Sequence, residues 1–376
     1  VLGSNADRNL LTCVNCGRIY SDEVLICPIC GWLTIFKYSN RAFRVDKAEP
    51  GIWRYRSVLP KVDRVVSKGE GLTPVNNIGG VLVKNERYNP TGTYSDRASS
   101  VIASYVLSKG LTTIRTKFEE DFTYSLTYYL IGVSSIEVVV GDPLSLDYLD
   151  VDILLRAGNV KLIFGENEKA SLLGYTSPLT IEGLKTIAFE IYERRLRVER
   201  VVVPARTGLL AYSIWKGFRD LEDAGVNASY EVVATSIKGM GNPILPEFAK
   251  SIKLVEISRD EAFDSLVKLW KNGVKTKPLS ASAYAIAENM GNSVAVVTMG
   301  FRPLSAGRRT DKGVRKEIIR ILEKSGGATA YEVWKVFPAY SLRGIYKVLE
   351  SMEEMGEVCS DFKSRGKRKI KYYRVC

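Results

Sequence analysis

The chain has 376 residues, of which 45% are apolar and 26% are charged, a composition that supports two or three folded domains and excludes a disordered or fibrous protein. Its net charge is +12 at pH 7, and it contains neither histidine nor glutamine. Ser-His-Asp or Cys-His catalysis and imidazole metal ligands are therefore excluded, so a metal would need cysteine or carboxylate ligands.

The same composition bears on source and location. The absence of glutamine beside many Lys, Arg and Glu residues indicates a thermophile. No apolar run reaches the roughly eighteen residues that a membrane span needs, so we expect no membrane partner. We expect a soluble, cytoplasmic protein.

The first predicted domain, residues 1–45, is a zinc ribbon. Cys13, Cys16, Cys27 and Cys30 form two Cys-x2-Cys turns, each followed by glycine. Four thiolates suit a closed, structural Zn²⁺ site with no open position for catalysis. The alternative is two disulfides or a redox pair, which is disfavoured because disulfides are rare in intracellular proteins. On the same ground, Cys359 and Cys376 are predicted to stay free thiols.

The second predicted domain, residues 46–307, alternates short apolar strands with amphipathic helices and predicts an open α/β fold. The predicted strands cover 81–84, 137–140, 161–164, 200–203, 231–235 and 293–298. The predicted helices cover 96–109, 181–194, 209–224 and 259–272.

Three stretches of this domain carry a resemblance: 69–74, 81–86 and above all Asn89-Pro90-Thr91-Gly92-Thr93-Tyr94-Ser95-Asp96-Arg97. They resemble threonine synthase, a fold type II family that uses pyridoxal phosphate and carries the motif Asn-Pro-Thr-Gly-Ser-Phe-Lys-Asp-Arg. The resemblance implies open twisted sheets flanked by helices, in two lobes. It also indicates an archaeal source, because archaeal members often begin with a similar ribbon. It implies that Thr298 matches the residue that bonds the pyridine nitrogen.

The departures from this family matter more. Ser95 stands where the family has the lysine that forms the Schiff base, and a hydroxyl cannot form an imine. The expected glycine-rich phosphate loop reads Ala205–Leu210, with one glycine and a bulky pair, and the expected Ser-Thr-Gly-Asn-Thr segment is replaced by Arg115–Asp121. We therefore predict a pseudoenzyme without pyridoxal phosphate, in which Ser95 and Thr298 mark a degenerate cofactor site. The old cleft could still bind a small anion through Arg206 and Arg115.

The third predicted domain, residues 308–376, holds 17 basic and 9 acidic residues, against 37 and 33 in the preceding 307 residues. This concentration of positive charge indicates a polyanionic partner. Helices are predicted over 311–324, 330–336 and 342–355, with Thr329 and Glu332 forming a capping box. Strands are predicted over 357–362 and 370–375, with a basic turn over 363–369.

This order resembles a winged helix-turn-helix, in which the third helix enters the major groove. The predicted DNA-binding residues are the outward side chains near the start of that helix and the cations of the turn. They are Tyr340, Ser341, Arg343, Lys347, Lys363, Arg365, Lys367, Arg368 and Lys369.

These features predict a nucleoid-associated protein that binds double-stranded DNA in transcription, replication or chromatin. The body would be catalytically inactive and would supply a homodimer interface or a partner surface. Two alternatives stay open: a ligand sensor or residual enzyme that uses the old cleft, and an RNA- or ribosome-associated factor. Winged helices also serve as protein-interaction modules.

Overall fold

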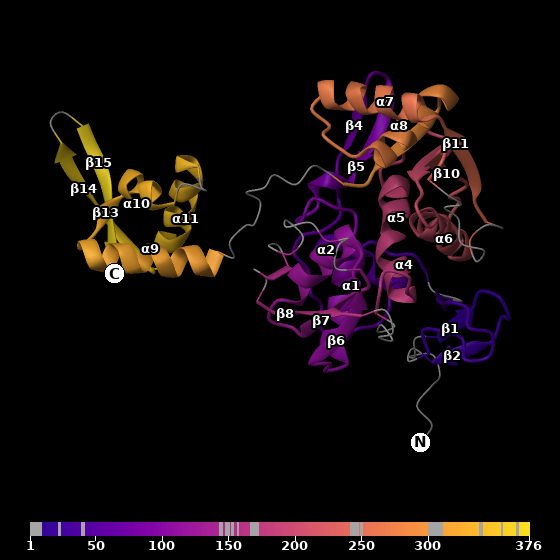
Figure 1. Ribbon diagram of the computed structural model, residues 1–376, viewed down its shortest axis with the longest axis horizontal. Helices are drawn as coiled ribbons and strands as arrows, with labels where there is room; N and C mark the ends of the chain where they lie inside the picture. Colours follow the sequence, from indigo (N-terminus) through magenta and orange to yellow (C-terminus); the bar gives the residue numbers. More distant parts are fainter. Residues whose placement is uncertain are drawn as a thin grey trace. The chain divides into compact units, whose positions relative to one another are not determined.

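The computed structural model describes residues 10–21, 24–38, 42–142, 146, 151, 154–155, 158–165, 173–240, 248, 251–299, 311–337, 341–354, 356–365 and 368–376. The chain forms two compact units, Val1–Phe301 and Arg302–Cys376, which Figure 1 shows in ribbon form. We call the first unit, apart from its N-terminal ribbon, the body.

The N-terminal ribbon is a small antiparallel sheet in the order β2-β1-β3. Its strands are β1 (Leu10–Cys13), β2 (Ile19–Ser21) and β3 (Thr34–Lys37). Leu11 and Phe36 are paired across β1 and β3 and are buried in the main core of the body. The ribbon is thereby anchored to the rest of the unit.

The larger sheet of the body has six strands in the order β11-β10-β9-β12-β5-β4. All neighbours are parallel except the edge hairpin β4–β5. The strands are β4 (Val75–Ile78), β5 (Val81–Asn85), β9 (Arg200–Pro204), β10 (Glu231–Ile237), β11 (Lys253–Ile257) and β12 (Ser293–Val297).

Alternate residues of these strands enter different cores, because successive side chains of a strand point to opposite faces. On β9, Val201 and Val203 belong to the main core, whereas Val202 belongs to a second one. Helices α5 (Thr186–Glu193) and α6 (Leu209–Asp223) contribute to the main core. Helices α7 (Arg259–Lys271) and α8 (Pro278–Met290) contribute to the second.

A smaller parallel sheet, β6-β7-β8, forms the other lobe of the body. Its strands are β6 (Thr113–Lys117), β7 (Ser135–Val140) and β8 (Val160–Phe164). This sheet shares the main core with helices α1 (Asp96–Ser108), α2 (Glu120–Leu130) and α4 (Pro178–Leu184). The body also contains the 3-10 helices η2 (Gly51–Val58) and η3 (Glu86–Tyr88). The predicted open α/β fold with flanking helices is confirmed.

Most of the predicted elements are present, with three differences. The helix predicted over 181–194 is divided into α4 and α5 at Lys185. The stretch 115–121, read from sequence only as a lost glycine segment, forms most of β6 and the start of α2. Strands β4 and β11 and helix α8 were not predicted.

The second unit consists of α9 (Asp311–Ser325), β13 (Ala328–Thr329), α10 (Ala330–Val336), α11 (Leu342–Glu354), β14 (Val358–Arg365) and β15 (Arg368–Val375). Its antiparallel sheet has the order β13-β15-β14. The three predicted helices and the Thr329–Glu332 capping box are confirmed. The predicted seven-residue turn is too long, because β14 and β15 pair as far as Arg365 and Arg368.

One prediction for this unit is wrong. Cys359 and Cys376 form a disulfide and are not free thiols. Cys359 lies on β14 and Cys376 follows the end of β15, so the antiparallel register brings the two ends of the hairpin together. In the part of the chain that the structure describes, no helix is long and apolar enough to cross a membrane.

Candidate functional site

The four cysteines predicted to bind zinc come together at one end of the ribbon. All four Sγ atoms lie within 4.8 Å of one another, with Cys13 and Cys30 at 3.4 Å and Cys16 and Cys27 at 3.7 Å. In a tetrahedral site with Zn–S bonds of about 2.3 Å, the sulfurs are about 3.8 Å apart. The four thiolates therefore fit one structural Zn²⁺.

Two glycines make this geometry possible. Gly17 and Gly31 have φ of +69° and +71°, and their N–H groups donate to the carbonyl oxygens of Cys13 and Cys27 at 3.1 and 2.9 Å. A side chain would be strained in this left-handed region, which glycine occupies readily. Each Cys-x2-Cys turn thus closes tightly enough to point two sulfurs at one centre.

The Tyr20 hydroxyl lies 3.1 Å from Cys27 Sγ. Burial raises the pKa of the Cys27 thiol, but hydrogen bonds from Tyr20 and from the backbone of Cys30 and Ile29 outweigh it and lower the pKa to about 6. The thiolate, which is the form that binds metal, is thereby favoured. Sequence spacing did not reveal the contribution of Tyr20.

The second candidate site surrounds Ser95, at the start of α1. Ser95 is fully buried, and its Oγ has no hydrogen-bond partner among the described residues. The adjacent Tyr94 N–H donates to the Thr298 carbonyl at 2.9 Å, and Thr298 Oγ1 lies 2.6 Å from Ser280 Oγ. The structure therefore brings together Ser95 and Thr298, which the resemblance assigned to one site.

The residues at this place do not fit a covalently held pyridoxal phosphate. Ser95 supplies no amine for a Schiff base. The loop before α6 keeps only Gly208, with φ of +83°, and Thr207 Oγ1 accepts a hydrogen bond from the Leu209 N–H at 3.4 Å. The Leu209 N–H is one of the backbone amides at the start of α6 that would otherwise be available to donate to a bound phosphate.

Two details of the sequence interpretation need correction. Leu209 and Leu210 do not crowd the loop, because both are buried in the main core; the loop presents Arg206 and Thr207 instead. Arg115 is not a free anion ligand, since its guanidinium binds Glu137 of β7 at 2.7 Å. Arg206 is exposed and lies close enough to Glu119 to lower the pKa of that carboxyl, which burial raises on balance.

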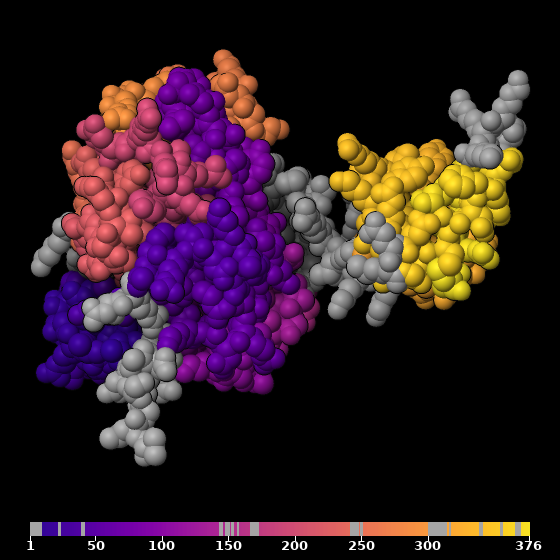
Figure 2. Space-filling model, turned by 180° about the vertical axis from the view of Figure 1, so that it is seen from behind, coloured from indigo at the N-terminus to yellow at the C-terminus, as the bar shows by residue number. Residues whose placement is uncertain are grey.

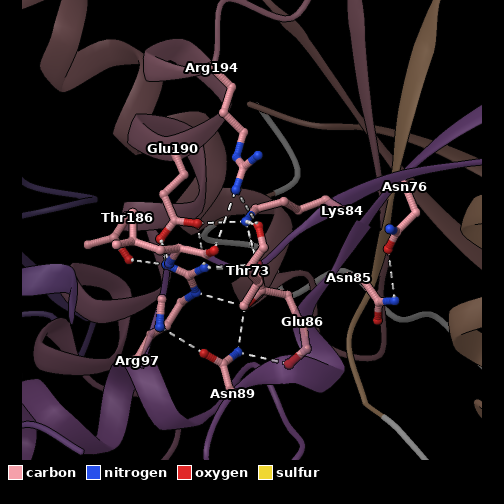
Figure 3. Close-up of polar contacts among 12 residues, drawn as sticks. Thr73, Asn76, Lys84, Asn85, Glu86, Asn89, Arg97, Thr186, Glu190 and Arg194 are labelled. Carbon is pink, nitrogen blue, oxygen red and sulfur yellow. Dashed lines mark hydrogen bonds and ion pairs between the residues drawn. The ribbon is translucent and has the colours of Figure 1, made fainter. Parts of the chain in front are cut away.

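A buried ionic network, shown in Figure 3, lies beside the motif. Glu190 accepts from Lys84 at 2.6 Å and from Arg97 at 2.6 Å, and Arg97 also binds Glu86 at 2.7 Å. Burial alone would raise the pKa of both carboxyls, but Arg97 and Lys84 outweigh it and keep both below their ordinary values. Two cations and two carboxylates thus compensate one another inside the core.

This network holds the motif turn in place. Asn89 donates to Glu86 Oε2 at 2.8 Å and accepts from the Gly71 N–H at 2.9 Å. Because the network joins β5, η3, α1 and α5, it supports the fold rather than a reaction centre. No sequence pattern predicted this network.

The C-terminal unit places the predicted DNA-binding residues on α11 and on the β14–β15 hairpin. Ile345, Leu349 and Met352 are buried in the core of this unit, whereas Arg343 and Lys347 are exposed. Ser341 caps the helix, since its Oγ accepts from the Gly344 N–H at 3.0 Å.

On the hairpin, the Lys363 ammonium lies 3.4 Å from the centre of the Tyr372 ring. The backbone of Arg365, Arg368 and Lys369 belongs to the paired strands. Tyr340, Lys367 and the side chains of Arg365, Arg368 and Lys369 lie outside the described residues.

Two acidic residues, Glu353 at the end of α11 and Glu357 just beyond it, form ion pairs within the unit. Glu353 accepts from Lys371 at 2.6 Å, and Glu357 accepts from Arg315 at 3.2 Å. Arg343 and Lys347, in contrast, appear in none of the ion pairs found in the described part of the chain. The first half of α11 therefore presents two exposed cations that are in no ion pair within the described part of the unit.

The fold of the body resembles that of a class of proteins, the fold type II enzymes dependent on pyridoxal phosphate. Serine racemase from Dictyostelium discoideum superposes with a TM-score of 0.52 at 15% identity, covering 61% of this chain and 91% of that one. Tomato threonine deaminase isoform 2 superposes with a TM-score of 0.51, covering 71% and 94%. At such identity, the likeness concerns the fold alone.

Sequence comparison identifies the family. The model of the pyridoxal-phosphate dependent enzyme family matches residues 155–299. Threonine synthase of Methanocaldococcus jannaschii is 30% identical over 281 residues, 65% of this chain and 69% of that protein. Threonine synthase of Methanosarcina acetivorans is 27% identical over 321 residues, 76% and 78% of the two chains. The chain therefore belongs to the threonine-synthase-like family of pyridoxal-phosphate-dependent enzymes.

Proposed function

We propose that this chain binds double-stranded DNA through its C-terminal unit, which we interpret as a winged helix-turn-helix. The observation that carries the proposal is α11, whose exposed Arg343 and Lys347 lie opposite the buried Ile345 and Leu349. A helix packed in this way offers one cationic face to a groove, and the strands of the adjacent hairpin offer Lys363. The surplus of 17 basic over 9 acidic residues after position 307 supports the same partner.

The test measures binding of the full chain to double-stranded DNA by fluorescence anisotropy over a salt series. The double variant Arg343→Ala/Lys347→Ala should weaken binding by about tenfold or more and reduce the salt slope by about 0.9 for each lost phosphate contact. The matched control, Arg320→Ala/Lys324→Ala, removes two exposed cations from α9 and should leave the slope unchanged.

Two outcomes would contradict the proposal. Equal losses in both double variants would show that net charge alone attracts DNA. Tighter binding of single-stranded RNA than of duplex DNA would favour the RNA-associated alternative. Crosslinking in cells, followed by sequencing of bound DNA, tests the expected association with the nucleoid.

We further propose that the body is catalytically inactive and binds no pyridoxal phosphate covalently. The support is Ser95, which occupies the Schiff-base position of the family motif and is fully buried. The test adds pyridoxal phosphate to the full chain, reduces it with borohydride and maps modified lysines by peptide mass spectrometry. We expect no lysine modified in stoichiometric amount. One fully modified lysine, accompanied by an aldimine absorbance band, would overturn the proposal.

A further inference from the structure

Helix α7 carries an apolar stripe on its outer side. The side chains of Phe263 and Trp270 are 61% and 42% exposed, and the half-buried Leu266 and Val267 lie between them in the sequence. The spacing i, i+3, i+4 and i+7 places the four on one side of the helix. Figure 2 shows the orange residues of this region at the surface of the body.

One aromatic ring of the stripe is held by a hydrogen bond, and a further exposed apolar residue lies near the start of α7. The Trp270 indole N–H donates to the Thr276 carbonyl at 3.0 Å, so the exposed ring is held in one orientation. Met240, 51% exposed, follows Gly239, which lies against the Arg259 guanidinium at the start of α7. Large apolar side chains that are exposed next to one another indicate an interaction surface, whereas single exposed apolar residues do not.

Charged residues flank the stripe in a definite order. Asp260 and Asp264 lie in the first half of α7, and Lys268 and Lys271 lie in the second half; all four are exposed. At about 100° per residue, Asp260 and Lys271 lie on one flank of the stripe, whereas Asp264 and Lys268 are turned further from it, with Lys268 almost on the opposite face of the helix. Lys268 also binds Glu288 of α8 at 2.8 Å.

We propose that a second copy of this chain packs on this stripe, with the two α7 helices antiparallel about a two-fold axis. Such an axis brings the same flank of both helices together in reverse order. Phe263 then meets Trp270 of the second copy, and Asp260 faces its Lys271. Parallel packing about a two-fold axis would instead place the charged flanks of the two helices on opposite sides of the interface, where they do not meet. The charge order is thus complementary to itself, which favours a second copy over an unrelated protein.

The first test is sedimentation velocity of the full chain over a range of concentrations, without DNA, so that its outcome is independent of the proposed DNA binding. The wild type should dimerise, and Phe263→Glu should raise the dissociation constant about a hundredfold or more. The control is Phe164→Glu on β8, where the side chain is 55% exposed, and it should dimerise like the wild type. A wild type that stays monomeric at every concentration, or a Phe263→Glu variant that dimerises normally, would overturn the proposal.

The second test asks whether the helices are antiparallel. Asp260→Lys and Lys271→Asp each create two like-charge pairs across the proposed interface, so each alone should dimerise about tenfold more weakly. An equimolar mixture of the two variants restores opposite charges at both positions and should regain wild-type affinity as a heterodimer. A mixture as weak as either variant would refute this arrangement. Both side chains are exposed, and thermal melting verifies that each variant is folded.

Discussion

Asp96 is a buried carboxyl whose ionisation opposes folding. Burial raises its pKa to about 6, although Ser125 and Thr91 donate hydrogen bonds to it. Because the folded pKa exceeds the unfolded value, the folded state binds the proton more tightly. The resulting stability is fully present below about pH 4 and is lost as the pH rises through about 6.

We therefore predict a pH-dependent effect of Asp96→Asn, which cannot ionise. Relative to this variant, the wild type should lose about 3 kcal/mol of unfolding free energy between pH 4 and pH 8. Urea unfolding of the body at several pH values measures the difference. Asp223→Asn, at an exposed position of α6, is the control. A wild-type minus variant difference that does not change with pH would contradict the assigned pKa.

The cysteine cluster gives a second prediction at this scale. Cys27→Ser removes one of four ligands, and a site with three thiolates binds structural zinc much more weakly. Bound zinc, measured by mass spectrometry of the purified protein, should fall from one ion per chain to almost none. Cys359→Ser also removes one cysteine but leaves the cluster intact, so it should retain the ion. Retained zinc in Cys27→Ser would refute the four-cysteine assignment.

The sequence alone could single out residues whose spacing carries the chemistry. The four cysteines are neighbours in pairs, and Ser95 stands inside a contiguous motif, so both could be located without coordinates. The network of Lys84, Arg97 and Glu190 could not, because its members are 106 and 93 residues apart. Each alone resembles an ordinary surface charge, and only their common burial shows their role.

At the scale of elements, the packing of α1 against α4 depends on a missing side chain. A Cβ at Gly183 of α4 would lie 2.3 Å from the Arg97 carbonyl oxygen, which belongs to the backbone of α1. The helices can approach this closely only because residue 183 is glycine. Backbone atoms inside a packed core cannot move away cheaply.

We accordingly predict that Gly183→Ala destabilises the body by about 3 kcal/mol or more. Thermal unfolding followed by circular dichroism measures the effect. Gly141→Ala is the matched control, because a Cβ at Gly141 meets no atom within 4 Å, and it should change stability little. A Gly183→Ala protein as stable as the control would show that α1 and α4 separate more easily than their contact indicates.

Elements could be predicted where apolar periodicity was strong and missed where it was not. β9 reads Val201-Val202-Val203 and was found at once. β6 alternates buried Ile114 and Thr116 with exposed Thr113 and Lys117, so its sequence looks polar. The break between α4 and α5 cannot be recognised in the sequence either. It falls at Lys185, whose charge predicts an exposed side chain, but which is buried and forms ion pairs with Glu182 and Asp220.

The whole molecule combines two units with separate cores and different charge. The apolar cluster of the C-terminal unit includes Val314, Ile318 and Leu349 and no residue of the body, and the division falls at Phe301 and Arg302. Two units with separate cores are expected to unfold in two transitions. A change confined to one core should therefore shift one transition and leave the other in place.

The Cys359–Cys376 disulfide is such a change, since it closes a loop of 17 residues within the C-terminal unit. In the chain-entropy account, a loop of this length stabilises the folded state by about 3 kcal/mol. Cys376→Ser should lower the transition of the C-terminal unit by several degrees in differential scanning calorimetry and leave the transition of the body unchanged. Reductant should lower the same transition in the wild type but not in Cys376→Ser. A shift of both transitions in Cys376→Ser would show instead that the two units unfold together.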